Sequence, residues 1–253
     1  HARMTAAFWC ASRGAGHEAL AHRAQAALVA ATTAAAHLFM PTLCPLDPRL
    51  RIVNASSPIG SFPMAVLSDA DIVSKEIATR GYWELKYPSE LLHLAGGSRG
   101  VELPRPGTFL DIGANLGFYT LLFAQHGYNV LAVEPMLLNR KAIETSLCLN
   151  PSLAARVRLM PVALGTVAAV NGKTRCVVRA DDRNPGNGKL YCSEGESCGR
   201  SKSHTGEHET ICEPVRMSTL DDLLNGERQK LSDAPIVATK IDVEGFECNV
   251  LSG

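Results

Sequence analysis

The sequence predicts an α/β domain built on a doubly wound, mostly parallel sheet. Three observations lead to this prediction. From Thr108 onward, apolar runs of strand length alternate with helical patterns. A glycine-containing turn joins the first run to the helix after it, and acidic residues end two of the later runs. Strands that alternate with helices form crossover units, which give a parallel sheet buried on both faces.

The elements of this domain follow one another along the chain. Strands are expected at 108–112, 129–134, 157–163 and 236–242, helices at 118–126 and 138–149, and a helical turn capped by Ser218 at 218–224. A doubly wound sheet orders its strands 3-2-1-4, so the first and fourth are neighbours and Asp111 should lie near Asp242. The fold looks truncated after the fourth strand. We therefore expect a fragment of a longer protein, or an edge covered by the N-terminal region.

The first hundred residues lack this alternation and are divided into two parts. Residues 1–61 are expected to hold an Ala-rich helix, 19–40, and a Pro-rich linker with little regular structure over 40–63. Residues 62–98 are expected to form a helical cap, in which Asp69 or Asp71 starts a helix that ends at Gly81. The domain itself then covers 99–253. The apolar centre of the Ala-rich helix is about 11 residues long, too short to be a firm membrane segment.

Composition excludes several classes of protein. The chain has 253 residues, of which 46% are hydrophobic and 20% charged, as in globular domains and unlike disordered chains or coiled coils. Lys+Arg and Asp+Glu number 25 each, so no net field attracts nucleic acid, and we expect no nucleic-acid partner. The oligomeric state is left open.

A polar insertion interrupts the domain at 165–213 and carries four of the eight cysteines, Cys176, Cys192, Cys198 and Cys212. Four cysteines allow three disulfide pairings, and free thiols are the next alternative. A zinc site with His204 and His208 is least favoured, because no Cys-x-x-Cys pair exists, so no metal is predicted. Cys148 and Cys248 are expected to be small core residues.

The compartment is only weakly indicated by the sequence. Asn54-Ala55-Ser56 is a glycosylation sequon, a short pattern that also arises by chance. Together with the cysteines of the insertion, it slightly favours the secretory pathway over the cytoplasm.

The turn after the first strand carries the strongest chemical signal. It reads DIGANLG from Asp111 to Gly117 and leads straight into a helix. Its glycines let backbone approach a ligand closely, and the N–H groups that open the helix face the space above the sheet. A dinucleotide fingerprint would have glycine at Asn115 and Phe118. A NAD-dependent dehydrogenase is therefore the weaker alternative.

Acidic residues end the second and fourth strands. Glu134 follows the glycine turn by about 20 residues, the spacing at which an acid accepts hydrogen bonds from the ribose of an adenosine cofactor. Asp242 and Glu244 follow the fourth strand. Carboxylates above one crevice suit acceptor binding or proton abstraction, and capping of the next helix is the structural alternative.

Taken together, these motifs resemble the FkbM-type methyltransferases, a family within the class I, Rossmann-like enzymes. The resemblance rests on residues 109–120, 133–135 with Asn139, 161–165 and 240–247. Residues 71–84 also look like the segment that opens the family's domain. The resemblance covers about 62–253 apart from the insertion, which has no counterpart that we can assign a role.

The resemblance implies a cofactor, a reaction and a set of site residues. Around S-adenosyl-L-methionine it places Asp111, Gly113, Ala114, Asn115, Gly117, Tyr119, Glu134, Pro135, Asn139 and Ala163. The implied reaction is O-methylation of a hydroxyl on a glycan or small natural product, with Asp242 or Glu244 as the catalytic base. Trp83 and Glu84 are expected either to border the active site or to pack in a core. A truncated, non-catalytic cofactor-binding module is the second alternative.

Overall fold

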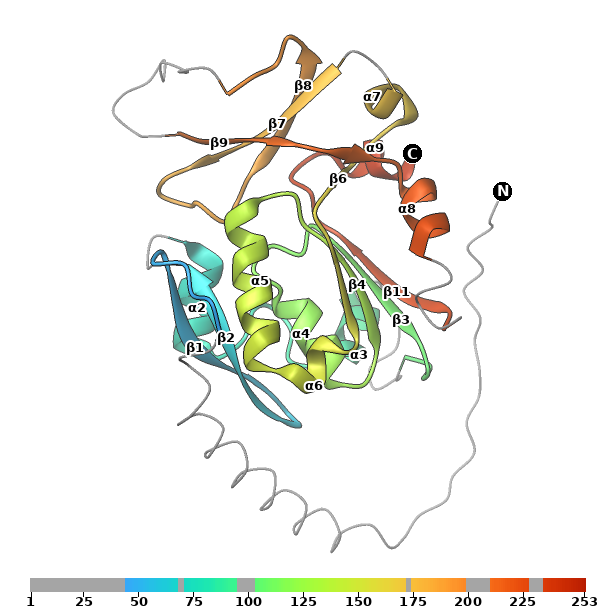
Figure 1. Cartoon of the computed structure of the whole chain (residues 1–253). Helices are drawn as coiled ribbons and strands as arrows, with labels where there is room; N and C mark the ends of the chain where they lie inside the picture. Colours follow the sequence, from blue (N-terminus) through green and yellow to red (C-terminus); the bar gives the residue numbers. More distant parts are fainter. Residues whose placement is uncertain (1–43, 68–70, 95–102, 172–173, 199–209, 228–233) are drawn as a thin grey trace, which may run out of the picture. The chain divides into compact units, whose positions relative to one another are not determined.

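The computed structural model describes residues 44–67, 71–94, 103–171, 174–198, 210–227 and 234–253 (Figure 1). These residues belong to one unit, Cys44–Gly253. The Ala-rich helix expected at 19–40 lies outside the described residues, as does Asp69. No helix in the described ranges is both long enough and apolar enough to span a membrane.

A four-stranded parallel sheet forms the centre, in the order β11-β3-β4-β5. The strands are β3 (Thr108–Ile112), β4 (Asn129–Val133), β5 (Val157–Met160) and β11 (Ile236–Ile241). The predicted order is confirmed, because the fourth expected strand pairs with the first. Ile241 lies in register with Ile112, so both strands end at the same edge of the sheet. In the part of the chain that the structure describes, β11 is an edge strand that pairs only with β3.

Helices pack on both faces of this sheet. They are α4 (Phe118–Gln125), α5 (Leu137–Leu149), α6 (Pro151–Ala154), α8 (Leu220–Glu227) and α9 (Glu247–Leu251). Phe109 of β3 stacks on Phe123 of α4 on one face. Its neighbour Leu110 packs with Leu223 and Val250 of α8 and α9 on the other. Successive side chains of a strand point to opposite faces, so a fully apolar strand needs cover on both.

The segment expected to be an irregular linker is largely a β-hairpin, and that prediction was wrong. β1 (Leu50–Ser57) pairs antiparallel with β2 (Gly60–Leu67). The prolines mislead because they stand where strands tolerate them: Pro45 and Pro48 precede β1, and Pro58 lies in the turn. Strand β2 also occupies the start of the expected helical cap.

The hairpin packs on α5, and a disulfide joins the segment before it to that helix. The backbone N–H of Ala65 in β2 donates to the Ser146 hydroxyl of α5 over 2.9 Å. Cys44 is bonded to Cys148. The expectation that Cys148 is a plain core thiol was wrong, because its partner comes from a segment that no local pattern places beside α5. Cys248, also expected in the core, is exposed on α9.

Two helices follow the hairpin, α2 (Ile72–Arg80) and α3 (Pro88–Leu94). The Asp71 carboxylate caps α2 by accepting from the Ser74 N–H over 2.7 Å. Gly81 ends the helix in the left-handed conformation, φ 80°. Both predicted ends of this helix are confirmed.

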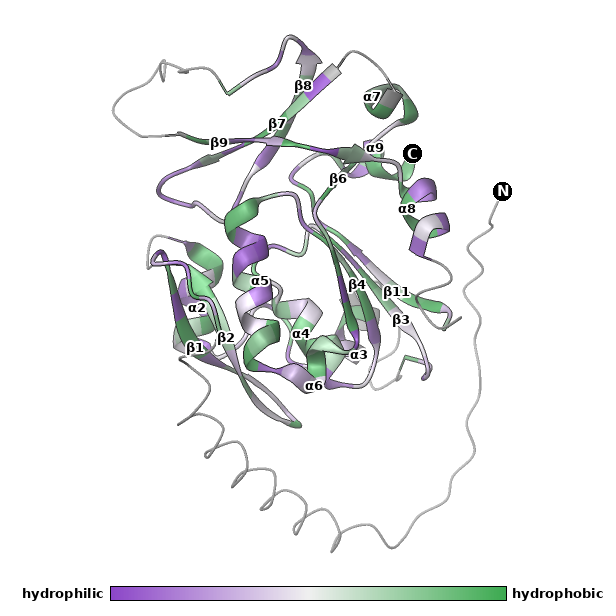
Figure 2. Ribbon diagram, viewed as in Figure 1, coloured by the Kyte–Doolittle hydropathy of each residue, from purple (hydrophilic) through white to green (hydrophobic). Residues whose placement is uncertain are grey.

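The insertion forms a sheet of its own. Helix α7 (Val167–Asn171) leads into strands β7 (Thr174–Asp181), β8 (Lys189–Glu194) and β9 (Thr210–Val215), which pair antiparallel in the order β8-β7-β9. Disulfides join Cys176 to Cys192 and Cys198 to Cys212. Hydrophilic residues are interspersed along these strands (Figure 2). The cysteines are therefore paired as disulfides, one of the alternatives that the sequence left open.

Short elements flank the insertion. Strand β6 (Ala163–Leu164) pairs with β10 (Met217–Ser218), so the expected third strand is divided into β5 and β6. Helix α8 begins at Leu220, and the Thr219 hydroxyl accepts from the Asp222 N–H over 3.0 Å. Thr219 rather than Ser218 therefore caps this helix.

Candidate active site

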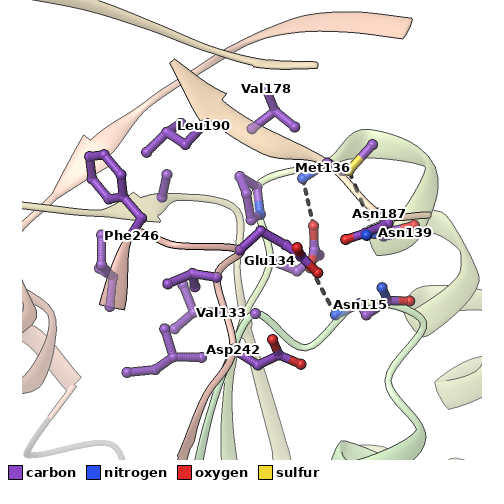
Figure 3. Close-up of a pocket in the computed structure, with 18 of the residues that line it drawn as sticks. Asn115, Val133, Glu134, Met136, Asn139, Val178, Asn187, Leu190, Asp242 and Phe246 are labelled. Carbon is purple, nitrogen blue, oxygen red and sulfur yellow. Dashed lines mark hydrogen bonds between the residues drawn. The ribbon is translucent and has the colours of Figure 1, made fainter. Parts of the chain in front are cut away.

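Two adjoining cavities lie at the carboxyl ends of β3, β4 and β11. Figure 3 shows the first, with Glu134 and Asn139 pointing into it and apolar side chains along its other wall. The second lies toward α2 and α4. Both are lined by Asn115, Asn187, Asp242 and Glu244. The ends of parallel strands, at the point where their order reverses, are where α/β sheets bind ligands.

The turn after β3 is held tightly between its neighbouring strands. The N–H groups of Gly113 and Ala114 both donate to the carbonyl of Val133, over 2.9 and 3.0 Å. Gly113 has φ 78°, and a Cβ there would lie 1.9 Å from the carbonyl oxygen of Asp242. Asn115 follows with φ 53°, which few residues other than glycine adopt. Only glycine fits at 113, because a side chain there would meet the backbone that follows β11, and Gly113 lines the first cavity.

Glu134 is the buried acid of the site. Only 4% of the residue is exposed. Its carboxylate accepts from the Asn115 N–H over 2.8 Å and from the Met136 N–H over 2.9 Å (Figure 3). Burial raises the pKa of Glu134 to about 7, although these hydrogen bonds oppose the rise. The glycine turn and the acid after β4 are therefore joined directly, at one rim of the first cavity.

Asn139 of α5 faces the same space. Its Nδ2 donates to the carbonyl of Gly186 over 3.0 Å, and Asn115 Nδ2 donates to that same oxygen over 3.0 Å. The Oδ1 of Asn139 is buried and has no hydrogen-bond partner among the described residues. A buried acceptor without a partner is uncommon in proteins, and it points to a donor from a ligand or water.

Asp242 stands between the two cavities. Its side chain is 60% exposed, and one carboxylate oxygen lies 3.2 Å from Lys240 Nζ, whose own side chain is only 13% exposed. The same ammonium donates to the carbonyl of Gly113 over 3.2 Å. Lys240 therefore ties the carboxylate to the glycine turn. Sequence reasoning missed this role, since Lys240 lies within β11 and nothing in the pattern shows which way it faces.

Glu244 lies in a turn that is braced from the following helix. It has φ 56° and is exposed. Glu247 accepts from the N–H groups of Val243 and Gly245, over 3.1 and 3.2 Å, and the hydrogen bond from its own backbone N–H, together with these two, lowers its pKa. The carboxylate that caps the turn is thus Glu247, which leaves Asp242 and Glu244 facing the cavities.

Aromatic side chains line the second cavity. Trp83 and Tyr119 both border it. The Tyr119 hydroxyl donates to the Glu84 carboxylate over 2.6 Å, and Lys240 Nζ lies 5.3 Å from the centre of the tyrosine ring. Burial and the Glu84 carboxylate raise the pKa of Tyr119, so its hydroxyl stays protonated. Glu84 has φ 52°, so three of the non-glycine residues gathered here have positive φ.

The residues singled out from the sequence divide into three groups. The first cavity is lined by Gly113, Asn115, Glu134, Pro135, Asn139 and Ala163. The second is lined by Ala114, Asn115 and Tyr119. Asp111 and Gly117 line neither. Asp111 is fully buried below the turn, where it accepts from the Thr120 hydroxyl over 2.6 Å and burial raises its pKa. Gly117 faces the Ile143 side chain. These two support the turn from behind.

The insertion supplies residues that sequence reasoning did not connect with the site. Gly186, Asn187 and Gly188 line the first cavity, and Asn184 lines the second. Asparagines and glycines in a polar stretch are also typical of plain surface turns, so no signal in the sequence marks them. Among the described residues no His, Cys, Asp or Glu cluster could hold a metal ion, and His204 and His208 lie outside that part of the chain.

Comparison with known families gives a match that covers more than half of the chain. A family model described as "Methyltransferase FkbM domain" matches residues 111–253. The match begins at Asp111 and includes the glycine turn, Glu134 and the two carboxylates after β11. No curated protein and no solved structure matches the chain.

Proposed function

Because the chain belongs to the FkbM methyltransferase family, we propose that it transfers a methyl group from S-adenosylmethionine to a hydroxyl oxygen of a glycan or small molecule. The observation that carries the proposal is the junction of Glu134 with the glycine turn. A buried carboxylate bonded to the Asn115 N–H lies beside a backbone that only glycine can form. An adenosine cofactor needs a carboxylate that accepts from its ribose hydroxyls. It also needs a glycine-containing turn whose backbone can approach the charged methionine part.

The residues of the first cavity suit this cofactor chemically. A carboxylate oxygen has two lone pairs, so Glu134 can accept from ribose hydroxyls while it keeps its backbone bonds. The unpartnered Oδ1 of Asn139 can accept a further hydrogen bond. Val162, Leu164 and Phe246 form an apolar wall that suits the flat adenine ring. On this proposal Gly113 and Ala114 border the methionine part.

The reaction requires little acid–base catalysis from the protein. The cofactor supplies a methyl group on a positively charged sulfur, so the main task is to align the acceptor oxygen with that carbon. The acceptor oxygen forms the new bond to carbon, and the electron pair of the broken carbon–sulfur bond stays on sulfur. The hydroxyl proton passes to a carboxylate, Asp242 or Glu244, since both border the two cavities.

Lys240 has a positioning role in this scheme. Its ammonium holds one oxygen of Asp242 and leaves the other free for the acceptor. The same ammonium acts on the buried Asp111. Burial raises the pKa of that carboxyl, and the positive charge of Lys240 partly offsets the rise.

Calorimetric titration of the protein with S-adenosylhomocysteine and with NAD⁺ tests the cofactor. We expect heat from S-adenosylhomocysteine only, and Glu134→Gln should weaken its binding at least about tenfold, as the loss of a charged acceptor does. The matched control is Glu76→Gln, a partly exposed residue of α2 that is paired with Arg80 and lies outside both cavities. Binding of NAD⁺ alone would overturn the proposal in favour of a dehydrogenase.

Amide variants of the two carboxylates test the catalytic base. Either Asp242→Asn or Glu244→Gln should abolish methyl transfer while S-adenosylhomocysteine still binds. If both variants turn over like the unmodified enzyme, neither residue is the base. If the cofactor binds but no hydroxyl compound or glycan is methylated, the chain is a non-catalytic binding module.

A further inference from the structure

The β1–β2 hairpin carries a motif that the proposed methyl transfer does not use. Asn54-Ala55-Ser56 lies within β1, and it is the one sequence in the chain that fits the N-glycosylation pattern, because Asn150-Pro151-Ser152 has proline in the middle. Residues 50–67 are all described by the structure, and none of them lines either cavity. A role for this motif is therefore separate from the cofactor and the acceptor.

Asn54 lies on the exposed face of the hairpin. Figure 1 shows β1 as the outer strand, on the far side of β2 from α5. Val53 and Ala55 pack in the core cluster beneath the hairpin, and strand side chains alternate between faces, so Asn54 faces the other way. Its side chain is exposed and makes no hydrogen bond to any residue that the structure describes. By contrast, the Asn150 Nδ2 donates to two backbone carbonyls, each over 2.7 Å.

The other two residues of the motif are held in place in the folded chain. Ala55 is fully buried. The Ser56 hydroxyl donates to the carbonyl of Gly81, at the end of α2, over 3.3 Å, and the Ser56 N–H donates to the same oxygen over 2.6 Å. A Cβ at Gly81 would lie 2.5 Å from the Ser56 hydroxyl oxygen, so the two segments are in close contact. An enzyme that reads all three residues therefore has access to them only before β1 packs against α2.

The folded hairpin has room for an oligosaccharide on Asn54. Among the strands that the structure describes, β1 pairs only with β2, so its other edge is open. Ile52, two residues earlier on the same face, is 40% exposed. An open strand edge with exposed apolar side chains tends to pair with other chains. A bulky, hydrated glycan beside Ile52 would cover that edge, so the modification suits this surface.

The disulfides indicate the compartment in which the chain folds. The structure contains three, and Cys248 is the one free cysteine among the residues that it describes. No described cysteine lines either cavity, so these bonds are structural rather than catalytic. Structural disulfides form in oxidising compartments such as the lumen of the endoplasmic reticulum and are rare in the cytosol. The same lumen is where Asn-x-Ser/Thr motifs receive their glycans.

We propose that Asn54 is an N-glycosylation site, modified in the endoplasmic reticulum before the hairpin folds. The donor is an oligosaccharide linked to a lipid diphosphate. The Asn54 Nδ2 forms a bond to the anomeric carbon of the first sugar as the bond from that carbon to the diphosphate oxygen breaks. The lipid diphosphate leaves with that electron pair and the nitrogen loses one proton, so no oxidant or reductant is needed. The site is independent of the proposed methyl transfer and goes beyond it.

The first test maps the chain as isolated from the cells that make it. Digestion with peptide N-glycosidase in water enriched in oxygen-18 converts a glycosylated asparagine into an aspartate that carries the heavy oxygen, which mass spectrometry locates. We expect this label at Asn54 and an unchanged asparagine at Asn150. A chain in which Asn54 is unmodified overturns the proposal.

Variants expressed in the same cells assign the glycan to the motif. Asn54→Gln and Ser56→Ala should each lose the glycan completely. Ser56→Thr should keep it, because the threonine hydroxyl completes the motif and can still donate to the Gly81 carbonyl. Ser56→Ala retains the asparagine, so a glycan that persists in this variant would overturn the assignment to the motif.

A second comparison tests the order of events. The unglycosylated chain, produced in bacteria, is presented to microsomal membranes with the lipid-linked donor, either folded or unfolded by reduction and alkylation. We expect transfer to the unfolded chain and none to the folded one, and equal transfer to both would overturn the proposed order. Calorimetry with S-adenosylhomocysteine is run on the glycosylated chain and on Asn54→Gln. If neither binds, the proposed function fails, while the oxygen-18 label at Asn54 still supports the glycosylation site.

Discussion

The central sheet and the sheet of the insertion are stabilised in different ways. Every residue of β3 is buried, and apolar clusters cover both of its faces. Strand β8 is mostly exposed, and the apolar cluster of its sheet has only Met136, Val178 and Ala180 as buried members. Two disulfides reinforce this second sheet. Burial thus stabilises the first sheet, and cross-links compensate for a small core in the second.

This difference separates two tasks in the site. The turn after β3 and Glu134 belong to the buried sheet, and on the proposed function this rigid backbone holds a cofactor that does not vary. The loop at 182–188 belongs to the cross-linked sheet, which can change in sequence without disturbing the core. The comparison predicts that damage to the two regions has effects of different size and kind.

The largest expected effect on stability comes from removing the disulfide that joins the segment before the hairpin to α5. Cys44 and Cys148 are 104 residues apart, against 16 for Cys176 and Cys192. Chain entropy makes the first bond worth about 4–5 kcal/mol and the second about 3 kcal/mol at most. Cys44→Ala/Cys148→Ala should therefore lower the free energy of unfolding of the whole unit, measured by guanidinium denaturation.

The matched variant is Cys176→Ala/Cys192→Ala. It should speed hydrogen exchange in β7 and β8 and leave β3 and β4 protected. Equal loss of protection in both sheets from this variant would contradict the separation of the two regions.

The next effect concerns the glycine turn itself. Gly113→Ala places a Cβ against the Asp242 carbonyl at φ 78°, whereas Gly127 has φ 88° with nothing within 4 Å. Both substitutions incur the cost of a left-handed residue, about 1–2 kcal/mol. Gly113→Ala adds about 1–3 kcal/mol of overpacking, so it should lose roughly 3 kcal/mol of stability together with S-adenosylhomocysteine binding. Thermal melts that rank the two variants equally would show that the turn is not tightly packed.

The smallest effect is the pH dependence of Glu134. Its pKa, about 7, lies above the ordinary value of 4.5. If only the carboxylate accepts the ribose hydroxyls, affinity for S-adenosylhomocysteine should fall roughly fivefold between pH 7 and pH 6. Stability should respond in the opposite sense: the contribution of this group is fully present below about pH 4.5 and is lost as the pH rises through about 7.

Glu134→Gln should flatten both profiles, because the amide does not titrate. Calorimetry and denaturant unfolding across pH 5 to 8 measure the two quantities on one pair of proteins. A binding profile that keeps its slope in the variant would assign the titration to another group.

Much of the buried sheet could be predicted because its signals are local. Strand β3 and helix α5 match their expected positions to within one residue, since an apolar run and a helical period are properties of neighbouring residues. The spacing of Glu134 from the turn predicted a ribose-binding acid near the turn, and the structure shows this carboxylate bonded to the Asn115 N–H. The side of the sheet that the Asp111 side chain faces was not predictable. The period of a strand shows that successive side chains face opposite sides of the sheet, but it does not show which side faces the ligand.

The sequence by itself determined the strand order and the place of the turn, because alternating periods and the handedness of crossover connections leave few arrangements. Only the tertiary structure decided that Asn115 and Asn139 both bind the Gly186 carbonyl, where Cys148 finds its partner, and that residues 50–67 are a hairpin. Asn115 and Gly186 are 71 residues apart in the chain. Contacts at such separations arise from the packing of whole elements, and no local pattern of residues encodes them.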